Sequence, residues 1–122
     1  MERHENQLAN DHYRHCYGSE QVHRILTLRN ILITDGIKEV AEKEECFWFL
    51  EIISSYQMYK EFKNAEHQIW KLERVEGCEF EVTAVDTSGN ILAIQKIPLT
   101  DFFFRELKVY KKGNVILLPS ED

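Results

Sequence analysis

Proline is scarce in this sequence, and no segment has the composition of a linker. The chain of 122 residues has two prolines, Pro98 and Pro119, and five glycines. It has no Pro/Gly/Ser-rich segment, no internal repeat and no low-complexity block, so nothing marks a boundary between domains. We therefore expect a single domain over residues 1–122, with residues 1–12 as a loose arm or a short helix.

Cysteine is too sparse for a disulfide framework. The three cysteines, Cys16, Cys46 and Cys78, are widely spaced, and no CxxC pair occurs. Such a set is typical of reduced thiols. The polar first fifteen residues lack the apolar core of a secretion signal. We therefore expect a cytoplasmic protein.

Long apolar runs and an excess of positive charge are also missing. The densest apolar run, residues 46–50, ends at Glu51, whereas a membrane-spanning helix needs about 20 such residues. The formal net charge is -6, opposite in sign to the basic surface that binds nucleic acid. We expect neither a membrane nor a direct nucleic-acid partner.

Apolar residues are nevertheless plentiful. The composition is 43% hydrophobic and 30% charged, with seven Phe and two Trp, as in ordinary globular proteins. A domain of this length buries about two-thirds of its unfolded surface. It therefore needs neither a disulfide nor a metal to fold.

The first half of the chain has mainly a helical period. Residues 31–34 suggest a strand or an extended entry, and from Asp35 to about Phe62 apolar residues recur at helical spacing, with a break near Glu45. Asp35 is placed to cap this helix, because its carboxylate can accept a hydrogen bond from an amide of the first turn. Residues 47–50 are apolar nearly all round, which predicts a deeply packed helix.

The second half alternates apolar and polar residues, as half-buried strands do. Candidate strands lie at 67–75, 78–85 and 90–97, and again at 106–110 and 114–118. The short turns between them suit antiparallel hairpins. We predict an α+β fold, with two or three helices packed on one face of a four- to five-stranded antiparallel meander sheet.

Thr-Asp pairs follow apolar stretches twice, at Asp35 and at Asp101. Two converging carboxylates could serve acid–base chemistry or hold a divalent cation. The structural interpretation, which the sequence favours, is that each pair caps a helix or turn, a contribution of about 1 kcal/mol. The alternative is a polar pocket of Asp35, Glu51, Gln95 and Asp101, which come from a helix start, a helix interior, a strand end and a turn.

Histidine and cysteine cluster near the start of the chain, at His12, His15, Cys16 and His23. Imidazole and thiolate are zinc ligands, but a structural site needs four well-spaced ligands, and the second pair is missing unless His67 or Cys78 folds back. We therefore expect surface side chains and no metal or cofactor. Cys16 is the one candidate nucleophile, since Cys46 and Cys78 are expected to be small buried hydrophobes. The GxSxG, HExxH and phosphate-loop motifs are absent.

Three consecutive phenylalanines, Phe102, Phe103 and Phe104, cannot all face one way in a regular helix or strand. Either they join two core layers at a bend, or one of them is exposed and contacts a partner.

Several segments together carry a resemblance to one protein family: YGSEQ (17–21), ITDGIKEVAE (33–42), FWFLEIISSYQ (47–57), IWKL (69–72), QKIPLTDF (95–102) and VILLPSED (115–122). The chain resembles a small, uncharacterised family of bacterial proteins, often carried in genomes rich in plasmids and prophages. That family usually has Asp where this chain has Glu51, and commonly has Pro where it has Phe103. It carries no established activity. The resemblance implies that both Thr-Asp pairs, Trp48, Trp70, Gln95 and the Leu-Pro-Ser-Glu end belong to one recurring design.

No complete catalytic constellation is present, and aromatic residues are in surplus. The function we expect is therefore a non-enzymatic cytoplasmic binding or adaptor module. It would contact a protein partner through the aromatic surface near Phe102–Phe104, or it would self-associate. The alternative is a small enzyme, or a small-molecule or metal-binding protein, that uses the pocket of Asp35, Glu51, Gln95 and Asp101.

Overall fold

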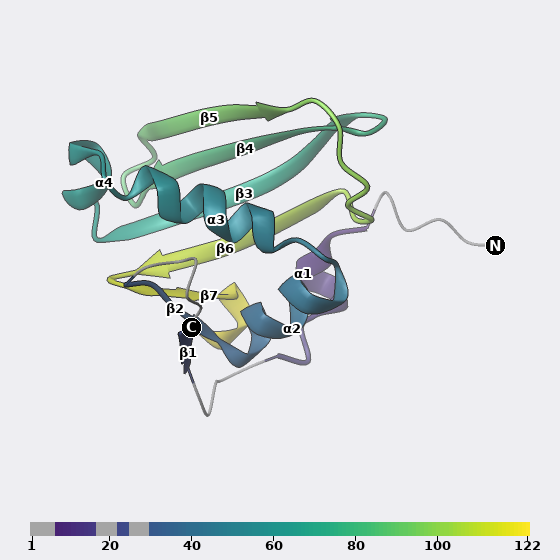
Figure 1. The fold of residues 1–122 in the computed structure, drawn as a ribbon, viewed down its shortest axis with the longest axis horizontal. Coiled ribbons are helices and arrows are strands. Elements are labelled where there is room, and N and C mark those ends of the chain that lie inside the picture. The colour runs from purple at the N-terminus through teal and green to yellow at the C-terminus, as the bar shows by residue number, and fades with distance from the viewer. Residues whose placement is uncertain (1–6, 17–21, 25–29) are drawn as a thin grey trace.

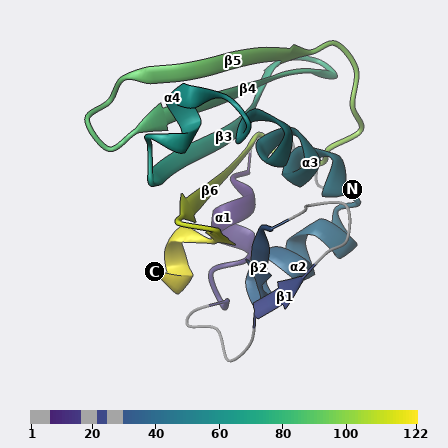
Figure 2. The same cartoon turned by 60° about the vertical axis from the view of Figure 1, so that its left-hand side comes forward.

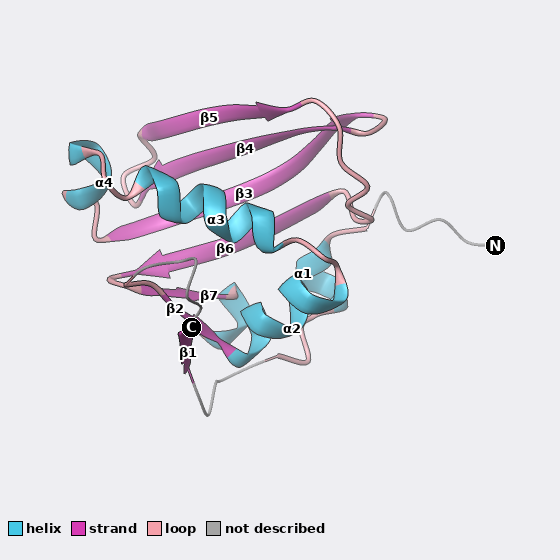
Figure 3. Cartoon of the chain, viewed as in Figure 1, coloured by secondary structure: helices cyan, strands magenta, loops and turns pink. Residues whose placement is uncertain are grey.

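The structure is a computed structural model that describes residues 7–16, 22–24 and 30–122. Four α-helices and seven strands, followed by a short 3₁₀ helix, make up the described chain (Figures 1 and 3). In chain order they are α1 (Ala9–His12), β1 (Val22–Arg24), β2 (Leu32–Thr34), α2 (Asp35–Lys43), α3 (Phe47–Tyr56), α4 (Lys60–Lys63), β3 (His67–Glu76), β4 (Glu79–Asp86), β5 (Ile91–Ile97), β6 (Glu106–Lys112), β7 (Val115–Leu117) and the 3₁₀ helix η2 (Pro119–Glu121).

The expected fold, two or three helices on a four- to five-stranded antiparallel meander, is wrong, because the described chain has four α-helices and seven strands. The strands form one seven-stranded mixed sheet in the order β1-β2-β7-β6-β3-β4-β5, and β2 pairs with β7 in parallel. The predicted hairpins of β3 with β4 and β4 with β5 are present, and β6 adds to the other side of β3. Strand β2 lies within residues 31–34, for which the sequence suggests a strand or an extended entry outside the meander. Strand β1 was not expected, because its three residues are too few for the alternation that identifies a strand in a sequence.

The core lies between one face of the sheet and α3, which crosses in front of it in Figure 1. Alternate residues of β3 and β4 face this layer, and Trp70, Leu72, Phe80 and Val82 are each at most 1% exposed. The ring of Tyr56, the last residue of α3, lies 5.7 Å from the ring of Trp70. The period-two alternation seen in the sequence therefore marks the buried face correctly.

Helix α2 begins at Asp35, but its cap is Thr34. The Thr34 hydroxyl accepts a hydrogen bond from the Ile37 amide at 3.3 Å. The prediction that Asp35 is the capping residue is therefore wrong by one position. A hydroxyl at the N-cap satisfies a free amide of the first turn as a carboxylate would.

The break predicted near Glu45 separates α2 from α3. Glu45 has φ 51°, and it is the one non-glycine residue with positive φ in the described part of the chain. The Cys46 amide donates back to the Ala41 carbonyl at 3.0 Å. This bond is the signature of a Schellman ending, in which glycine usually takes the left-handed position.

The C-terminal turn is joined to the start of α2 through Glu121. One oxygen of its carboxylate accepts from the Thr34 hydroxyl at 2.6 Å, and the other accepts from the Gly36 amide at 3.0 Å. A carboxylate is favoured here, because the free amides of a helix N-terminus carry partial positive charge. The end of the chain therefore holds α2 against the sheet.

The segment from residue 7 to Tyr13 continues the sheet along β6. Leu8 bridges Glu106, and the Arg105 amide donates to the Gln7 carbonyl. The Asn10 side chain donates to the Lys108 carbonyl at 2.8 Å and accepts from the Lys108 amide at 2.7 Å. These two hydrogen bonds replace those that the backbone of a neighbouring strand would form. Within the segment 1–12, expected as a loose arm or a short helix, residues 9–12 form the helix α1, and residues 1–6 lie outside the described residues.

Of the two thiols expected to be buried, Cys46 is 2% exposed but Cys78 is exposed. Gly77, with φ 55°, turns the chain between β3 and β4, and β4 begins only at Glu79. Cys78 therefore belongs to the hairpin turn and not to the core-facing row.

No helix among the described residues is long and apolar enough to cross a membrane.

Candidate functional site

The four residues proposed for a polar pocket lie in different surroundings. Asp35 opens α2, and its carboxylate lies 2.6 Å from Nε2 of His23 in β1. Gln95, in β5, accepts a hydrogen bond from the Tyr56 hydroxyl at 3.0 Å. Glu51 is exposed on α3, and Asp101 is exposed in the loop after β5.

The strand order separates two of these residues. Asp35 follows β2 directly, and β2 is five strands away from β5, which carries Gln95. At about 4.8 Å per strand, the separation along the sheet is roughly 24 Å. Figure 2 likewise places α2 beside β1 and β2, away from β5 at the opposite edge. The contacts of these residues therefore give no support to one pocket containing all four.

Asp101 instead lines a groove beside the N-terminal end of α3. The groove has a volume of about 670 Å³, within the range of about 300–1,000 Å³ that is usual for ligand sites. Its lining is formed by Glu45, Trp48, Cys78, Ile97, Leu99, Thr100 and Asp101. The walls are mainly apolar, and both charged residues in the lining are carboxylates.

The loop that forms one side of this groove is held in place by hydrogen bonds. Pro98, which has no amide proton to continue a ladder, follows the last residue of β5. The Thr100 amide donates to the Cys78 carbonyl at 3.0 Å, which ties the loop to the β3–β4 turn. The Thr100 hydroxyl accepts from the Phe102 amide at 3.3 Å. Thr100 is therefore the residue of the second Thr-Asp pair whose side chain caps the turn.

The triple phenylalanine divides between core and surface. Phe102 and Phe104 are 3% and 2% exposed, whereas Phe103 is 45% exposed. The Phe102 ring meets the Phe80 ring edge-on at 5.7 Å. Arg74 lies over the other side of this cluster, with its guanidinium 4.6 Å from the Phe80 ring centre and a 2.8 Å hydrogen bond to the Phe102 carbonyl. Of the three rings, only that of Phe103 is available to a partner.

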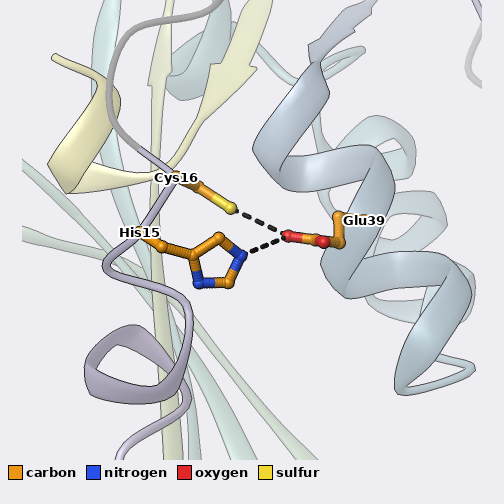
Figure 4. Close-up of side chains that lie close together, drawn as sticks. All are labelled: His15, Cys16 and Glu39. Atoms are coloured by element: carbon orange, nitrogen blue, oxygen red, sulfur yellow. Dashed lines mark hydrogen bonds and ion pairs between the residues drawn. The ribbon is translucent and has the colours of Figure 1, made fainter.

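The histidines and cysteine near the start of the chain separate into different contacts. The ring of His12 lies 5.2 Å from that of Phe104, and His23 pairs with Asp35. His15 and Cys16 both point toward Glu39 of α2 (Figure 4). The His15 Nε2 atom and the Cys16 thiol lie 3.0 and 2.9 Å from the same Glu39 oxygen, Oε2.

The electrostatics of this cluster decide the state of its thiol. Burial, together with the hydrogen bond to Glu39, raises the pKa of Cys16 to about 12. The thiol hydrogen bond, with help from Lys43 and His15, lowers the pKa of Glu39 to about 2. At neutral pH the cluster therefore holds a protonated thiol beside an ionised carboxylate. A nucleophile needs a thiolate, so this arrangement does not favour Cys16 as a catalytic group.

Sequence reasoning missed Glu39 and Leu99, and it named Trp48 only as part of the recurring design that the family resemblance implies. Glu39 lies on the partly exposed side of α2, 23 residues after Cys16, and nothing in its local pattern distinguishes it from the other glutamates there. Leu99 did carry a signal, because an apolar residue directly after a strand and a proline has no regular face to join. It is 78% exposed.

Comparison with known proteins places the chain in a family. The sequence profile of DUF6876, a family of unknown function, matches residues 7–122. No curated protein and no solved structure matches the chain significantly.

Proposed function

We propose that this chain, which belongs to the DUF6876 family of unknown function, is a non-enzymatic binding module for a protein partner. The groove beside α3 would take an apolar side chain of the partner that is flanked by lysine or arginine. The observation that carries the proposal is the groove itself, whose walls are apolar and whose charged residues, Glu45 and Asp101, are both acidic.

The apolar walls supply the attraction. Leu99 is 78% exposed and Trp48 is partly exposed, so both would lose contact with water when a side chain enters. Burial of apolar surface is worth about 25 cal/mol per Å². Tryptophan is among the residues most often responsible for binding energy at protein interfaces.

The charges select the kind of partner. A cationic segment would pair with the two carboxylates, whereas an acidic one would be repelled, so these charges favour one class of sequence and speed its association. The formal net charge of -6 has the same sign. Together these features favour a basic-apolar peptide over an acidic one.

Glu45 gives independent support, because its conformation is costly. The left-handed conformation costs a non-glycine residue about 1–2 kcal/mol, and glycine would remove this cost at the end of α2. Glutamate nevertheless occupies the position and lines the groove. Strained residues cluster at binding sites, so we infer that the carboxylate has a role there.

Two further parts of the proposal concern the surroundings of the module. Phe103, exposed in the same loop as Asp101, would extend the contact beyond the groove.

We place the protein in the cytoplasm because its three cysteines are free, and one of them, Cys78, is exposed in the groove. A reducing compartment keeps such a thiol from oxidising.

The test is selection from a phage-displayed library of random peptides on the full chain. We expect the selected peptides to share an apolar residue next to lysine or arginine. Synthetic versions should bind Leu99→Ser and Asp101→Lys at least roughly 10-fold more weakly, a loss of about 1.4 kcal/mol. The matched controls are Met58→Ser, another exposed apolar residue, and Glu51→Lys, an exposed acid on α3.

Two results would contradict the proposal. One is a set of selected peptides without basic residues. The other is equal binding to Leu99→Ser and Met58→Ser, because the apolar walls would then have no part in recognition.

Light scattering on the same variants tests the second possible partner, which is another copy of the chain. If the chain forms a dimer that dissociates in Leu99→Ser, a second copy would replace the peptide as occupant of the groove.

A second candidate function is binding of a small cationic molecule in the same groove. The observation that favours it is the volume of about 670 Å³ with Thr100 and Asp101 as polar groups. Tryptamine, an aromatic amine, is a suitable probe. A thermal shift with tryptamine that is lost in Asp101→Asn, from a protein that selects no peptides, would favour this alternative.

A further inference from the structure

We propose that His15, Cys16 and Glu39 form a zinc site with three protein ligands, which fastens the N-terminal segment to α2. The site is separate from the groove and does not depend on the proposed function. It differs from the four-residue cluster considered from the sequence, because it leaves out His12 and His23 and includes a glutamate from a distant element.

The three ligand atoms already converge. Nε2 of His15, Sγ of Cys16 and a carboxylate oxygen of Glu39 all lie within 4.8 Å of one another. Zinc bonds of about 2.0 Å to nitrogen or oxygen and about 2.3 Å to sulfur, at tetrahedral angles, place ligand atoms about 3.3–3.5 Å apart. To reach these values, the distance of 3.0 Å from His15 Nε2 to Glu39 Oε2 would lengthen by about 0.3 Å, and the distance of 2.9 Å from Cys16 Sγ to the same oxygen by about 0.6 Å.

The carboxylate is held in the orientation that a ligand needs. Lys43, one turn further along α2, donates to Glu39 Oε1 at 2.8 Å. Oε2 is therefore left facing His15 and Cys16 (Figure 4). Metal ligands typically have such an outer partner, which fixes the ligand and tunes its basicity.

The other side of the site is also held independently of the three ligands. The Cys16 amide donates to the Tyr13 carbonyl at 2.9 Å, and the Cys16 carbonyl accepts a hydrogen bond from the Ser120 hydroxyl. Tyr13 is 1% exposed, and its hydroxyl donates to Glu44, the residue after α2. Backbone contacts thus place Cys16 opposite α2, which lowers the entropy that metal binding would otherwise cost.

The donor set points to zinc in preference to magnesium or calcium. Thiolate and imidazole suit zinc, whereas magnesium and calcium prefer oxygen ligands. Zn²⁺ would take the place of the thiol proton, which is released to solvent. One thiolate and one carboxylate then balance the two positive charges. The His15 side chain is 62% exposed, so water has access to the fourth position.

The first experiment uses the full chain without an affinity tag, freed of metal by chelator. We expect it to bind one equivalent of Zn²⁺ and to melt at a higher temperature with Zn²⁺ but not with Mg²⁺. Co²⁺, used as a spectroscopic substitute, should give the ultraviolet absorption of a thiolate–metal bond. Less than one equivalent of zinc, or a cobalt complex without that absorption, would overturn the proposal.

The second experiment assigns the ligands. Cys16→Ser and His15→Ala should each weaken zinc binding by more than the 10- to 100-fold that is typical of losing an outer partner, and Lys43→Met should fall within that range. Cys78→Ser and His67→Ala, at exposed positions, are the matched controls and should bind as the original chain does. Circular dichroism of the metal-free variants verifies their fold. Unchanged zinc binding by folded Cys16→Ser would refute the assignment.

Discussion

Gln68 is a buried polar residue on which several neighbours depend. It is 1% exposed in β3, between the sheet and α3. Its side-chain oxygen accepts from the Trp70 indole at 2.9 Å, and its nitrogen lies 2.9 Å from the Ala65 carbonyl. It also pairs with the Gln57 amide, at 2.8 and 2.9 Å. An apolar replacement would leave these groups buried without partners.

We therefore expect Gln68→Leu to lower the free energy of unfolding by about 2–3 kcal/mol, because each unsatisfied buried group costs about 1–3 kcal/mol. Urea unfolding, followed by far-ultraviolet circular dichroism, measures the change. Gln95→Leu is the matched control, since Gln95 is half-buried and its one assigned bond is to Tyr56. Its cost should stay near 1 kcal/mol. Equal stability of the two variants would show that the Gln68 network contributes little.

At the scale of elements, the fold depends on how α2 is held at its start. Thr34 caps the helix from within, and Glu121 binds the same end from the last turn of the chain. Oε1 of Glu121 also accepts from the Leu118 amide at 2.9 Å. One side chain thus joins β2, α2 and η2.

We expect Glu121→Ala to destabilise the fold by about 2 kcal/mol, because it removes bonds between a charged acceptor and two amides and a hydroxyl. Glu121→Gln, which keeps one acceptor oxygen, should lose less. Asp122→Ala is the control. Asp122 forms an exposed ion pair with Lys112 at 2.5 Å, and such pairs contribute about 0–1 kcal/mol. Thermal unfolding would compare the three, and a loss for Asp122→Ala as large as for Glu121→Ala would contradict this account.

At the scale of the whole molecule, two segments that are far apart in the sequence complete one sheet. The parallel pairing of β2 with β7 joins Leu32 to Val115 and Ile33 to Ile116. Ile33 and Ile116 are each 0% exposed. Strands β1 and β2 therefore reach the rest of the sheet through β7, a strand that is distant from them in the sequence.

Removal of residues 113–122 should abolish cooperative unfolding, because β2 would lose its only assigned neighbour on the β6 side. Calorimetry of the full chain should give one transition, as expected for a single domain, and the truncated chain should give none. The control is insertion of two glycines after Ser88, in the exposed turn between β4 and β5, where added residues are tolerated. A truncated chain with an intact transition would mean that residues 30–34 contribute little to folding.

The spacing of apolar residues in the sequence was enough to predict the longer strands and helices, in which the repeat of that spacing occurs more than once. The alternation in β3, β4 and β6 predicts their buried faces, because side chains of a strand point alternately to its two sides. The break between α2 and α3 also lies where the helical pattern is interrupted. Both Thr-Asp pairs mark turns, although the caps are the hydroxyls of Thr34 and Thr100 and not the carboxylates.

Only the tertiary structure decided which distant residues meet. The hairpin of β6 with β7 was predicted, but the pairing of β1 with β2 and the parallel pairing of β2 with β7 were not. Three residues carry too little pattern to predict a distant partner or its direction. The groove exists because a turn, a loop and a helix start are packed together, and its residues are spread from Glu45 to Asp101. Glu39 meets His15 and Cys16 for the same reason. The sequence determines which side chains are present. The distances between these side chains follow from the order of the strands and from the packing of the helices on the sheet.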